Sequence, residues 1–564
     1  MQTDDTALEQ LGDNRPASYR GLLRDDRLAR ELYSEGAGIA RTLPLAVAVP
    51  QDAPDVIELI QWARRSAMSL MPRGSASGMA AGAIGPGIAV DLSQFKTIGD
   101  VDVGHRRIRV GAGAVRGEVE QAASTVGLRF PVDPSSGAFC TIGGMVGANA
   151  SGARTLRFGS TRPWVTGLEC VFDDGSMAWI RRGEALPTQI PAVARLSHAL
   201  AVLRSNVNRA ALVHAGVRKE SSGYAIDRAL QEDGSLIDLL VGSEGTLAVF
   251  TQVELALTAA AGATGTVLAL FDSLEAATEC ALLASGLGAA ACELLDRTFL
   301  EVAASKGASG VPSNVEAVLL IEMEAENASA VANETASVSA LLKTRGARDV
   351  VVGLSTEAQH ELWKLRHAAS PILSSLAPQL RSMQFIEDGC VPPANLPAYV
   401  RGVRAVLQRY EFRGVIFGHA GDSHMHVNPL VDVYRSGWRD RVRGALLDVC
   451  ELTHQLGGTL SGEHGDGRLR APLLAHVWSA EARAAFANIK AAADPAGVLN
   501  AGCKIAAAQD NFSGELRHDP TARPLSDEAR GILDRIERER AWNCFRLGAL
   551  DSREDRTANE TGAD

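Results

Sequence analysis

The sequence lacks closely spaced cysteines, long apolar runs and an excess of positive charge. Its eight cysteines are scattered without a C-x-x-C pair, which predicts reduced thiols rather than a disulfide framework or an iron–sulfur module. No run approaches the roughly 18–20 apolar residues of a membrane-spanning helix. The acidic N-terminus has no apolar signal-peptide segment. We therefore expect a soluble, cytoplasmic protein, and contact with the inner face of a membrane remains open.

The net charge of -11, without a basic stripe in any segment, argues against nucleic acid as a partner. A chain of 564 residues exceeds a single hydrophobic core, so two or more domains are expected. Alternating strand and helix patterns after residue 44 predict an α+β nucleotide-binding domain. A second series of strands and long helices begins near residue 264 and predicts an antiparallel sheet covered by helices.

Glycine is concentrated in two stretches. Residues 131–162 contain closely spaced glycines with short polar residues between them, namely Gly143, Gly144, Gly147, Gly152, Thr141, Asn149 and Ser151. Exposed backbone N–H groups of this kind suit a pyrophosphate, although the composition fits a surface loop equally well. Residues 73–87, RGSASGMAAGAIGPG, favour the phosphate site. They match neither the P-loop spacing nor a G-x-G-x-x-G turn between strand and helix.

Four short motifs carry a resemblance to a known family: DPSS at 133–136, TIGG at 141–144, NASG at 149–152 and GSEGTL at 242–247. With the loop at 73–87 they resemble the vanillyl-alcohol oxidase-type flavoproteins, and among these the FAD-linked D-2-hydroxyacid dehydrogenases. The resemblance covers about residues 33–505. It implies an α+β fold with a two-subdomain FAD-binding domain and an α+β substrate cap built on an antiparallel sheet.

On this basis the chain divides into five parts. They are a polar lead (1–32), the FAD-binding domain (33–258), the substrate cap (259–445), a segment returning to the FAD domain (446–505) and a charged, partly disordered tail (506–564).

The resemblance also implies the contacts of FAD. They are Arg73, Gly74, Ser75, Ala76, Ser77, Gly78, Pro134, Ser135, Thr141, Gly143, Gly144, Asn149, Ser151, Gly152, Glu244, Gly245, Val249 and Asn500. Because residues 73–87 contain no histidine for covalent attachment, we expect non-covalent FAD.

Histidines cluster late in the chain. GHAGDSHMHVNP at 418–429 holds three of the twelve histidines, and SGEHGDG at 461–467 pairs a carboxylate with another. A lone histidine is more often a satisfied or exposed side chain. Imidazoles in such number instead suggest a transition-metal site, and His424 and His426 share one face of an extended strand. An acid beside a histidine adds a group that titrates near neutral pH.

The resemblance assigns roles to these residues. His419, His426 and Glu463 would bind a divalent ion, Zn²⁺ or Mn²⁺, and His464 would be the catalytic base. His424 stands where the family often has asparagine, so it is either a fourth ligand or a neighbour of the ligands.

The substrate contacts implied by the resemblance are Arg366, Ser370 and Asn428. Arg366 matches the arginine that holds a substrate carboxylate, which a guanidinium grips through two parallel hydrogen bonds. The alternative for Arg366 is a solvated position on a helix.

The implied activity is oxidation of a D-2-hydroxy acid, of the D-2-hydroxyglutarate or D-lactate class, to the 2-oxo acid by hydride transfer to flavin N5. Two alternatives stay open: a flavin oxidase that uses O₂ on an alcohol or sugar, and a non-catalytic flavin-binding subunit. An electron acceptor is expected as a partner, either an iron–sulfur subunit, an electron-transfer flavoprotein or a quinone. A homodimer is also compatible with the sequence.

Overall fold

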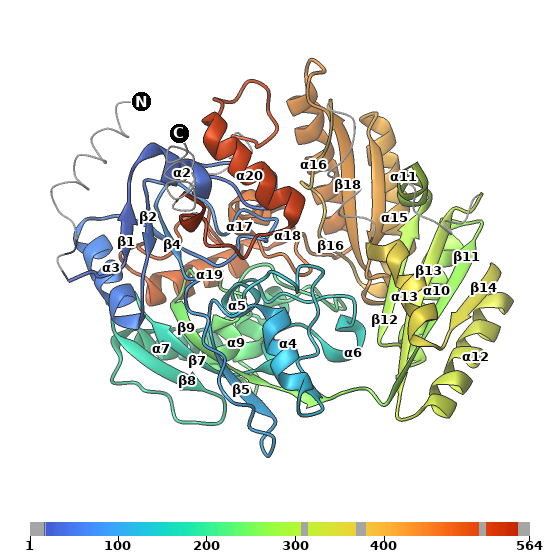
Figure 1. The fold of residues 1–564 in the computed structure, drawn as a ribbon, viewed down its shortest axis with the longest axis horizontal. Helices are drawn as coiled ribbons and strands as arrows, with labels where there is room; N and C mark the ends of the chain where they lie inside the picture. Colours follow the sequence, from blue (N-terminus) through green and yellow to red (C-terminus); the bar gives the residue numbers. More distant parts are fainter. Residues whose placement is uncertain (1–15, 17, 306–313, 368–378, 507–514, 551–564) are drawn as a thin grey trace, which may run out of the picture.

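The structure is a computed structural model, and it describes residues 16, 18–305, 314–367, 379–506 and 515–550 (Figure 1). Three sheets define its architecture: a small mixed sheet, a four-stranded antiparallel sheet and a larger antiparallel sheet. The first two lie together, and the large sheet lies beside them with its own helices (Figure 1). The predicted α+β fold with a two-part domain and a cap is therefore confirmed.

The first sheet carries the glycine-rich loop of residues 73–87. Its order is β1-β2-β4-β3, with β1 antiparallel to β2 and the other pairs parallel. The strands are β1 (Leu22–Arg24), β2 (Ala46–Val49), β3 (Leu70–Arg73) and β4 (Ile88–Asp91). Ala46 and Ala48 pack with α3 (Ala53–Arg65), whereas Val47 and Val49 pack with helices on the opposite face. Since both faces are covered, β2 is apolar throughout.

Residues 22–33 are part of this core, although they belong to the segment that we predicted as a polar lead (1–32). Strand β1 pairs with β2, and α2 (Arg27–Tyr33) follows it. The helix buries Ala29, Leu32 and Tyr33 against the sheet. Because the segment is mostly polar in composition, we did not predict that one face of this helix is apolar.

The C-terminal segment covers the same face of the sheet. The segment predicted as a charged tail contains α20 (Asp527–Glu539), which packs against α2 through Ile532 and Ile536 (Figure 1). The charged residues of α20 face outward, so the composition predicted a charged tail although one face of the helix is apolar. The disorder expected for residues 551–564 lies outside the described residues.

The second sheet has the order β5-β9-β7-β8 and is antiparallel. Its strands are β5 (Arg107–Gly111), β7 (Val165–Val171), β8 (Met177–Arg181) and β9 (Val249–Ala256), and β6 (Leu128–Arg129) pairs separately with β10 (Thr258–Ala259). The helices of this part are α4 (Arg116–Ser124), α5 (Ile142–Ala148), α6 (Thr155–Phe158), α7 (Pro191–Asn206), α8 (Ile226–Ala229) and α9 (Leu236–Leu240). The glycine-rich residues 131–162 run through this part and face the loop after β3.

The cap is built on an antiparallel sheet of order β14-β11-β13-β12-β17-β18-β15, with β16 paired to β18. Its strands are β11 (Ala263–Phe271), β12 (Ala291–Asp296), β13 (Ala317–Ala325), β14 (Ala347–Gly353), β15 (Leu380–Ser382), β16 (Gly389–Cys390), β17 (Arg413–Gly418) and β18 (His424–Asp432). One face packs with α10 (Leu274–Gly286), α12 (Ala328–Thr344) and α15 (Leu396–Arg409), on which lies α16 (Trp438–Gln455). The other face packs with α11 (Arg297–Ser305) and α13 (Thr356–His367).

After the cap the chain returns to the first domain. The boundary expected at residue 445 falls inside α16, so the return begins only after Gln455. It continues through α17 (Gly467–Arg470), α18 (Leu474–Val477) and α19 (Ala480–Ala493). Leu499 then forms a parallel bridge with Leu70 at the edge of the first sheet. This return brings residues 461–467 between the two domains.

Several helices begin where the sequence supplies a side-chain acceptor. The N-cap residues whose side chains accept the backbone N–H three positions later include Asp52, Ser273, Asn327, Ser479 and Ser526. Each such cap contributes about 1 kcal/mol. Among the described residues, no helix has the length and apolar composition to cross a membrane.

Charged pairs join the cap to the first domain. Arg154 donates from Nε to Glu322 at 2.6 Å and from Nη2 to its second oxygen at 2.9 Å. Arg129 binds Glu324 through two bonds of 2.9 and 2.6 Å. Both glutamates lie on β13 of the cap and are buried. Parallel pairs of this kind fix orientation as well as distance.

We expect Arg154→Ala to destabilise the protein by about 1–3 kcal/mol, because it leaves the buried Glu322 carboxylate without the donor that satisfies it. Urea unfolding followed by near-UV circular dichroism measures the change. Arg297→Ala is the matched control, since Arg297 pairs with two carboxylates but is half exposed. The control should change stability by less than about 1 kcal/mol. Equal effects of the two substitutions would contradict a role for Arg154 in joining the domains.

Candidate active site

The loop after β3 presents its backbone to a cavity. Ala76 has a φ of 54°, and among the described residues no acceptor is found for the backbone N–H groups of residues 74–78. A Cβ on Gly74 would lie 2.0 Å from Thr141 Oγ1, so the two glycine-rich stretches are in direct contact there. Arg73 anchors the loop by donating to the carbonyl oxygens of Tyr33 and Glu35. Successive free amides in such a turn form an anion-binding concavity.

A single cavity extends from this loop to the late acid–histidine pair, Glu463 and His464. The residues predicted for FAD that line it are Arg73, Gly74, Ser75, Ala76, Ser77, Gly78, Pro134, Ser135, Thr141, Gly143, Gly144, Ser151, Glu244 and Gly245. The lining is thus dominated by glycine, alanine and small hydroxyl residues. Free amides at one end and a lining of small residues fit the pyrophosphate and the flat ring of FAD.

Four residues predicted for FAD lie away from the lining. Val249 is buried in the core on one side of the chain, whereas its neighbours Ala248 and Phe250 face the cavity on the other side. Asn149 ends α5 with a φ of 52° and accepts a bond from the backbone N–H of Arg162. These side chains support the walls of the cavity.

The other two residues, Gly152 and Asn500, also contact the protein backbone. A Cβ on Gly152 would lie 2.2 Å from the carbonyl oxygen of Asp133, so only glycine fits there. Asn500 donates from Nδ2 to the carbonyl oxygens of Gly82 and Glu244, at 2.9 and 2.6 Å. The final segment therefore joins the phosphate loop to the GSEGTL segment.

The structure brings His419, His426 and Glu463 together. His419 Nε2 lies 3.2 Å from Glu463 Oε1 and 3.4 Å from His426 Nε2, and His426 Nε2 lies 3.4 Å from Glu463 Oε1. Bonds of about 2.0–2.1 Å in a tetrahedron place ligand atoms about 3.3 Å apart. The three atoms therefore form a triangle of the size that a divalent ion requires, and all three residues are buried.

Acceptors behind the two imidazoles orient them. His419 Nδ1 lies 2.5 Å from Glu293 Oε1, and His426 Nδ1 lies 2.9 Å from the carbonyl oxygen of Glu387. Both partners accept hydrogen bonds, so each Nδ1 carries the hydrogen and each Nε2 lone pair is available to an ion. Glu293 has no local sequence motif and was not predicted. It is brought to His419 by the pairing of β12 with β17.

The cluster favours positive charge at its centre. Burial lowers the pKa of His419, but Glu293 outweighs it and raises the pKa to about 9. Burial raises the pKa of Glu463, but Lys219 and His419 hold it well below its usual range. A buried carboxylate among imidazoles with these shifts is the electrostatic setting of a cation site.

His424 lies beside the triangle rather than in it. Its Nε2 contacts Asp388 Oδ1 at 2.7 Å, and its ring centre lies 4.7 Å from that of His426, on the shared face that the strand pattern predicts. Its Nδ1 is buried and has no hydrogen-bond partner among the described residues. Burial lowers the pKa of His424 to about 3. The ligand atoms of His424, His419, His426 and Glu463 lie within 4.8 Å of one another, so both roles predicted for His424, fourth ligand and neighbour of the ligands, stay open.

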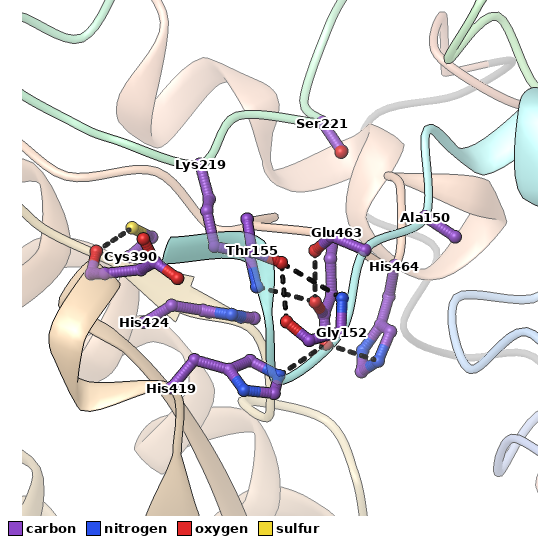
Figure 2. Close-up of polar contacts among 12 residues, drawn as sticks. Ala150, Gly152, Thr155, Lys219, Ser221, Cys390, His419, His424, Glu463 and His464 are labelled. Carbon is purple, nitrogen blue, oxygen red and sulfur yellow. Dashed lines mark hydrogen bonds and ion pairs between the residues drawn. The ribbon is translucent and has the colours of Figure 1, made fainter. Parts of the chain in front are cut away.

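His464 lies at the boundary between the cluster and the cavity (Figure 2). Its Nε2 is 3.7 Å from Glu463 Oε1, and its Nδ1 contacts Glu387 Oε2 at 3.0 Å. Burial lowers its pKa, but Asp388 and Glu387 outweigh this and raise the pKa to about 9. A cation bound nearby acts in the opposite direction. The residue thus has one nitrogen fixed by a carboxylate and the other beside the proposed ion.

Two carboxylates hold the loop that bears Glu463 and His464. Asp388 accepts from the backbone N–H of His464 at 2.9 Å and from Ser461 Oγ at 3.0 Å. Glu244 accepts from the backbone N–H groups of Asp466 and Gly467 at 2.7 and 2.8 Å. The glutamate of GSEGTL therefore clamps this loop at the edge of the cavity.

The structure describes two of the three residues predicted to contact the substrate. Arg366 is buried, not solvated; its Nε donates to Glu293 Oε2 at 2.6 Å, and its guanidinium lies over the Phe417 ring. It is connected through Glu293 to His419. Asn428 is buried and shares a face of β18 with His426. Ser370 lies outside the described residues.

Comparisons with known proteins match this architecture. A model described as the C-terminal domain of FAD linked oxidases matches residues 262–503, and an FAD binding domain matches residues 44–181. The chain is 30% identical over 460 residues to a D-lactate dehydrogenase of Archaeoglobus fulgidus, covering 81% of this chain and 90% of the relative. It is 28% identical over 483 residues to a glycolate oxidase subunit GlcD of Bacillus subtilis, covering 85% and 93%.

A longer relative also matches. The chain is 27% identical over 568 residues to a D-2-hydroxyglutarate dehydrogenase of Pseudomonas putida, covering 94% of this chain but 54% of that protein. The chain thus corresponds to about half of this longer relative.

Solved structures confirm the fold. A 4-ethylphenol oxidase from Gulosibacter chungangensis has a TM-score of 0.62 at 12% identity and covers 89% of this chain and 97% of its own. An alkyldihydroxyacetonephosphate synthase has a TM-score of 0.58 at 14% identity, covering 88% and 84%. Together with the matched domains and the D-lactate dehydrogenase, they show that the chain belongs to the FAD-linked oxidase family.

Proposed function

We propose that this FAD-linked oxidoreductase oxidises a D-2-hydroxy acid to the corresponding 2-oxo acid with the help of a divalent ion. The observation that carries the proposal is the continuity of the cavity: it begins at the free amides of residues 74–78 and ends at Glu463 and His464. The triangle of His419, His426 and Glu463 adjoins that end. A flavin ring and a chelating substrate can therefore meet there.

FAD in the cavity would supply the acceptor at N5 for the α-hydrogen as hydride, and a divalent ion at the triangle, Zn²⁺ or Mn²⁺, would supply Lewis acidity at the hydroxyl oxygen. The protein supplies the proton transfer. His464 Nε2 takes the hydroxyl proton, while Glu387 at Nδ1 holds the ring and stabilises the imidazolium that results. Loss of this proton and of the hydride leaves the 2-oxo acid.

The proposed substrate class rests on charge and on the named relatives. Arg366 supplies a buried guanidinium close to the ligand cluster, which suits the carboxylate of a small acid. Glycolate, D-lactate and D-2-hydroxyglutarate, named in the relatives, are all 2-hydroxy acids. These relatives support D-lactate and D-2-hydroxyglutarate as the first substrates to test.

We also propose that FAD binds without a covalent bond. Cys140 lines the cavity, but burial raises the pKa of its thiol to about 11. A protonated thiol is a poor nucleophile, so attachment of flavin at this position is disfavoured. Electrons would leave through a separate acceptor, such as an iron–sulfur subunit, an electron-transfer flavoprotein or a quinone. The word subunit in the name of the glycolate oxidase relatives supports an assembly with other chains.

His464→Ala should lower kcat by about 100- to 10,000-fold, the contribution of a positioned general base, while the protein retains FAD. Dye-coupled turnover and the flavin absorbance measure the two effects. His198→Ala is the matched control, because His198 is exposed on α7 far along the chain from the cluster. Full residual activity of the His464 variant would remove this residue from its role as base.

Removal of divalent ions with a chelator should abolish turnover, and addition of Zn²⁺ or Mn²⁺ should restore it. Elemental analysis should find one ion per chain in the parent protein. His426→Ala should lose that ion but keep the flavin, because the phosphate loop is remote from β18 in the fold. Undiminished turnover after complete removal of divalent ions would contradict the metal-dependent part of the proposal.

Anaerobic addition of D-lactate or D-2-hydroxyglutarate should bleach the flavin, whereas the L-enantiomers should not. A fixed carboxylate anchor and a fixed flavin leave one face of the α-carbon toward N5. The absorbance of oxidised flavin measures the reaction. Hydrogen peroxide release under air with an alcohol or sugar would instead favour an oxidase, and absence of bleaching by any hydroxy acid would favour a non-catalytic flavin-binding subunit.

A further inference from the structure

The two oxygens of Glu463 have different surroundings. Oε1 faces His419 and His426 at 3.2 and 3.4 Å. Oε2 accepts from Lys219 Nζ at 2.7 Å (Figure 2). It also accepts from Ser151 Oγ at 2.5 Å. A carboxylate oxygen that holds two strong donors has little capacity left for an ion. The protein therefore offers the ion one oxygen, not two.

Lys219 is an internal cation. It is 4% exposed, and it lies on the loop between α7 and α8 of the FAD-binding domain. Its Nζ donates to Glu463 Oε2 at 2.7 Å, so the two residues form a buried ion pair. A buried lysine of this kind is stable only beside its carboxylate. Figure 2 shows the side chain directed toward the ligand cluster.

The loop that bears Lys219 is fixed against the loop that bears Glu463. The backbone N–H of Ser221 donates to the carbonyl oxygen of Ser461 at 2.8 Å, and that of Gly223 donates to Asp466 Oδ2 at 2.7 Å. These bonds hold the loop that bears Lys219 against the residues on both sides of Glu463, so the ammonium is kept within reach of this carboxylate.

The charges of the cluster can be added. His419 and His426 are neutral when each Nε2 serves as a ligand, Glu463 contributes one negative charge and Lys219 one positive charge. Farther out, Glu293 is offset by Arg366 at 2.6 Å. These four groups thus carry no net charge, because Lys219 cancels the charge of Glu463.

We propose that Lys219 is the fixed counter-charge of the metal site: it makes Glu463 a one-oxygen ligand and keeps the bound ion strongly electrophilic at the cost of affinity. This inference rests on the proposed metal-dependent function. Repulsion between two like charges a few ångströms apart is large in a buried site. The arrangement weakens ion binding and strengthens the pull of the ion on an anionic, chelating substrate.

The test is the Zn²⁺ affinity of Lys219→Met in the FAD-loaded protein, stripped of ions and titrated against a chromophoric chelator. The parent should bind one ion, and the variant should bind it at least about tenfold more tightly, because the opposing charge is gone. Lys219→Arg keeps the charge and should stay within about threefold of the parent.

The opposite result would show a merely structural lysine. Loss of a residue that only orients a ligand weakens metal binding about 10- to 100-fold. Weaker or unchanged Zn²⁺ affinity in Lys219→Met, with the flavin absorbance and circular dichroism of the parent, overturns the inference. Lys219→Gln provides the same comparison if the methionine variant does not fold. A parent protein that binds no Zn²⁺ contradicts the proposed function itself, so the two failures are distinguishable.

Discussion

The candidate site depends on backbone N–H groups of residues 461–467 that bind buried carboxylates. This loop is irregular, so no β-sheet hydrogen bonds fix the positions of Glu463 and His464. Asp388 holds its first half and Glu244 its second, each by accepting backbone N–H groups, and Lys504 lies 3.0 Å from Glu244. These hydrogen bonds fix both halves of the loop and thereby position Glu463 and His464.

The ligands come from parts of the chain that fold separately. His419 and His426 flank the β17–β18 turn of the cap, whereas Glu463 lies on the segment that returns to the FAD-binding domain. Lys219 and Ser151 approach from that domain. The triangle therefore exists only when cap and domain are docked, and the pairs of Arg129 and Arg154 with β13 maintain this docking. Ion binding and domain docking are then thermodynamically linked.

Much of this arrangement could be predicted from sequence, because short motifs place several functional residues within a few positions of one another. The strands and helices around the glycine-rich stretches were predicted from hydrophobic periodicity. We predicted that Val249 contacts FAD. Side chains alternate along a strand, and its neighbours Ala248 and Phe250 face the cavity instead. Asn149 and Asn500 form hydrogen bonds with the protein backbone. A sequence motif does not distinguish this role from the binding of a ligand.

Other features could not be predicted locally. Glu293 lies 126 positions from His419 and has no motif around it; only the β12–β17 pairing makes it the partner of a ligand. The same holds for the packing of α20 against α2, because the two helices lie at opposite ends of the chain. Long-range pairing determines both, and a single sequence does not contain it.

Ser151 gives the flavin cavity and the ligand cluster a shared residue. It lines the cavity, and its hydroxyl donates to Glu463 Oε2. Any shift of residues 149–152 caused by a bound flavin ring therefore reaches the carboxylate through one hydrogen bond, and ion binding acts on the same bond from the other side. Two ligands that act on one bond affect each other reciprocally. The flavin and the ion are accordingly expected to bind as coupled parts of one site rather than as independent cofactors.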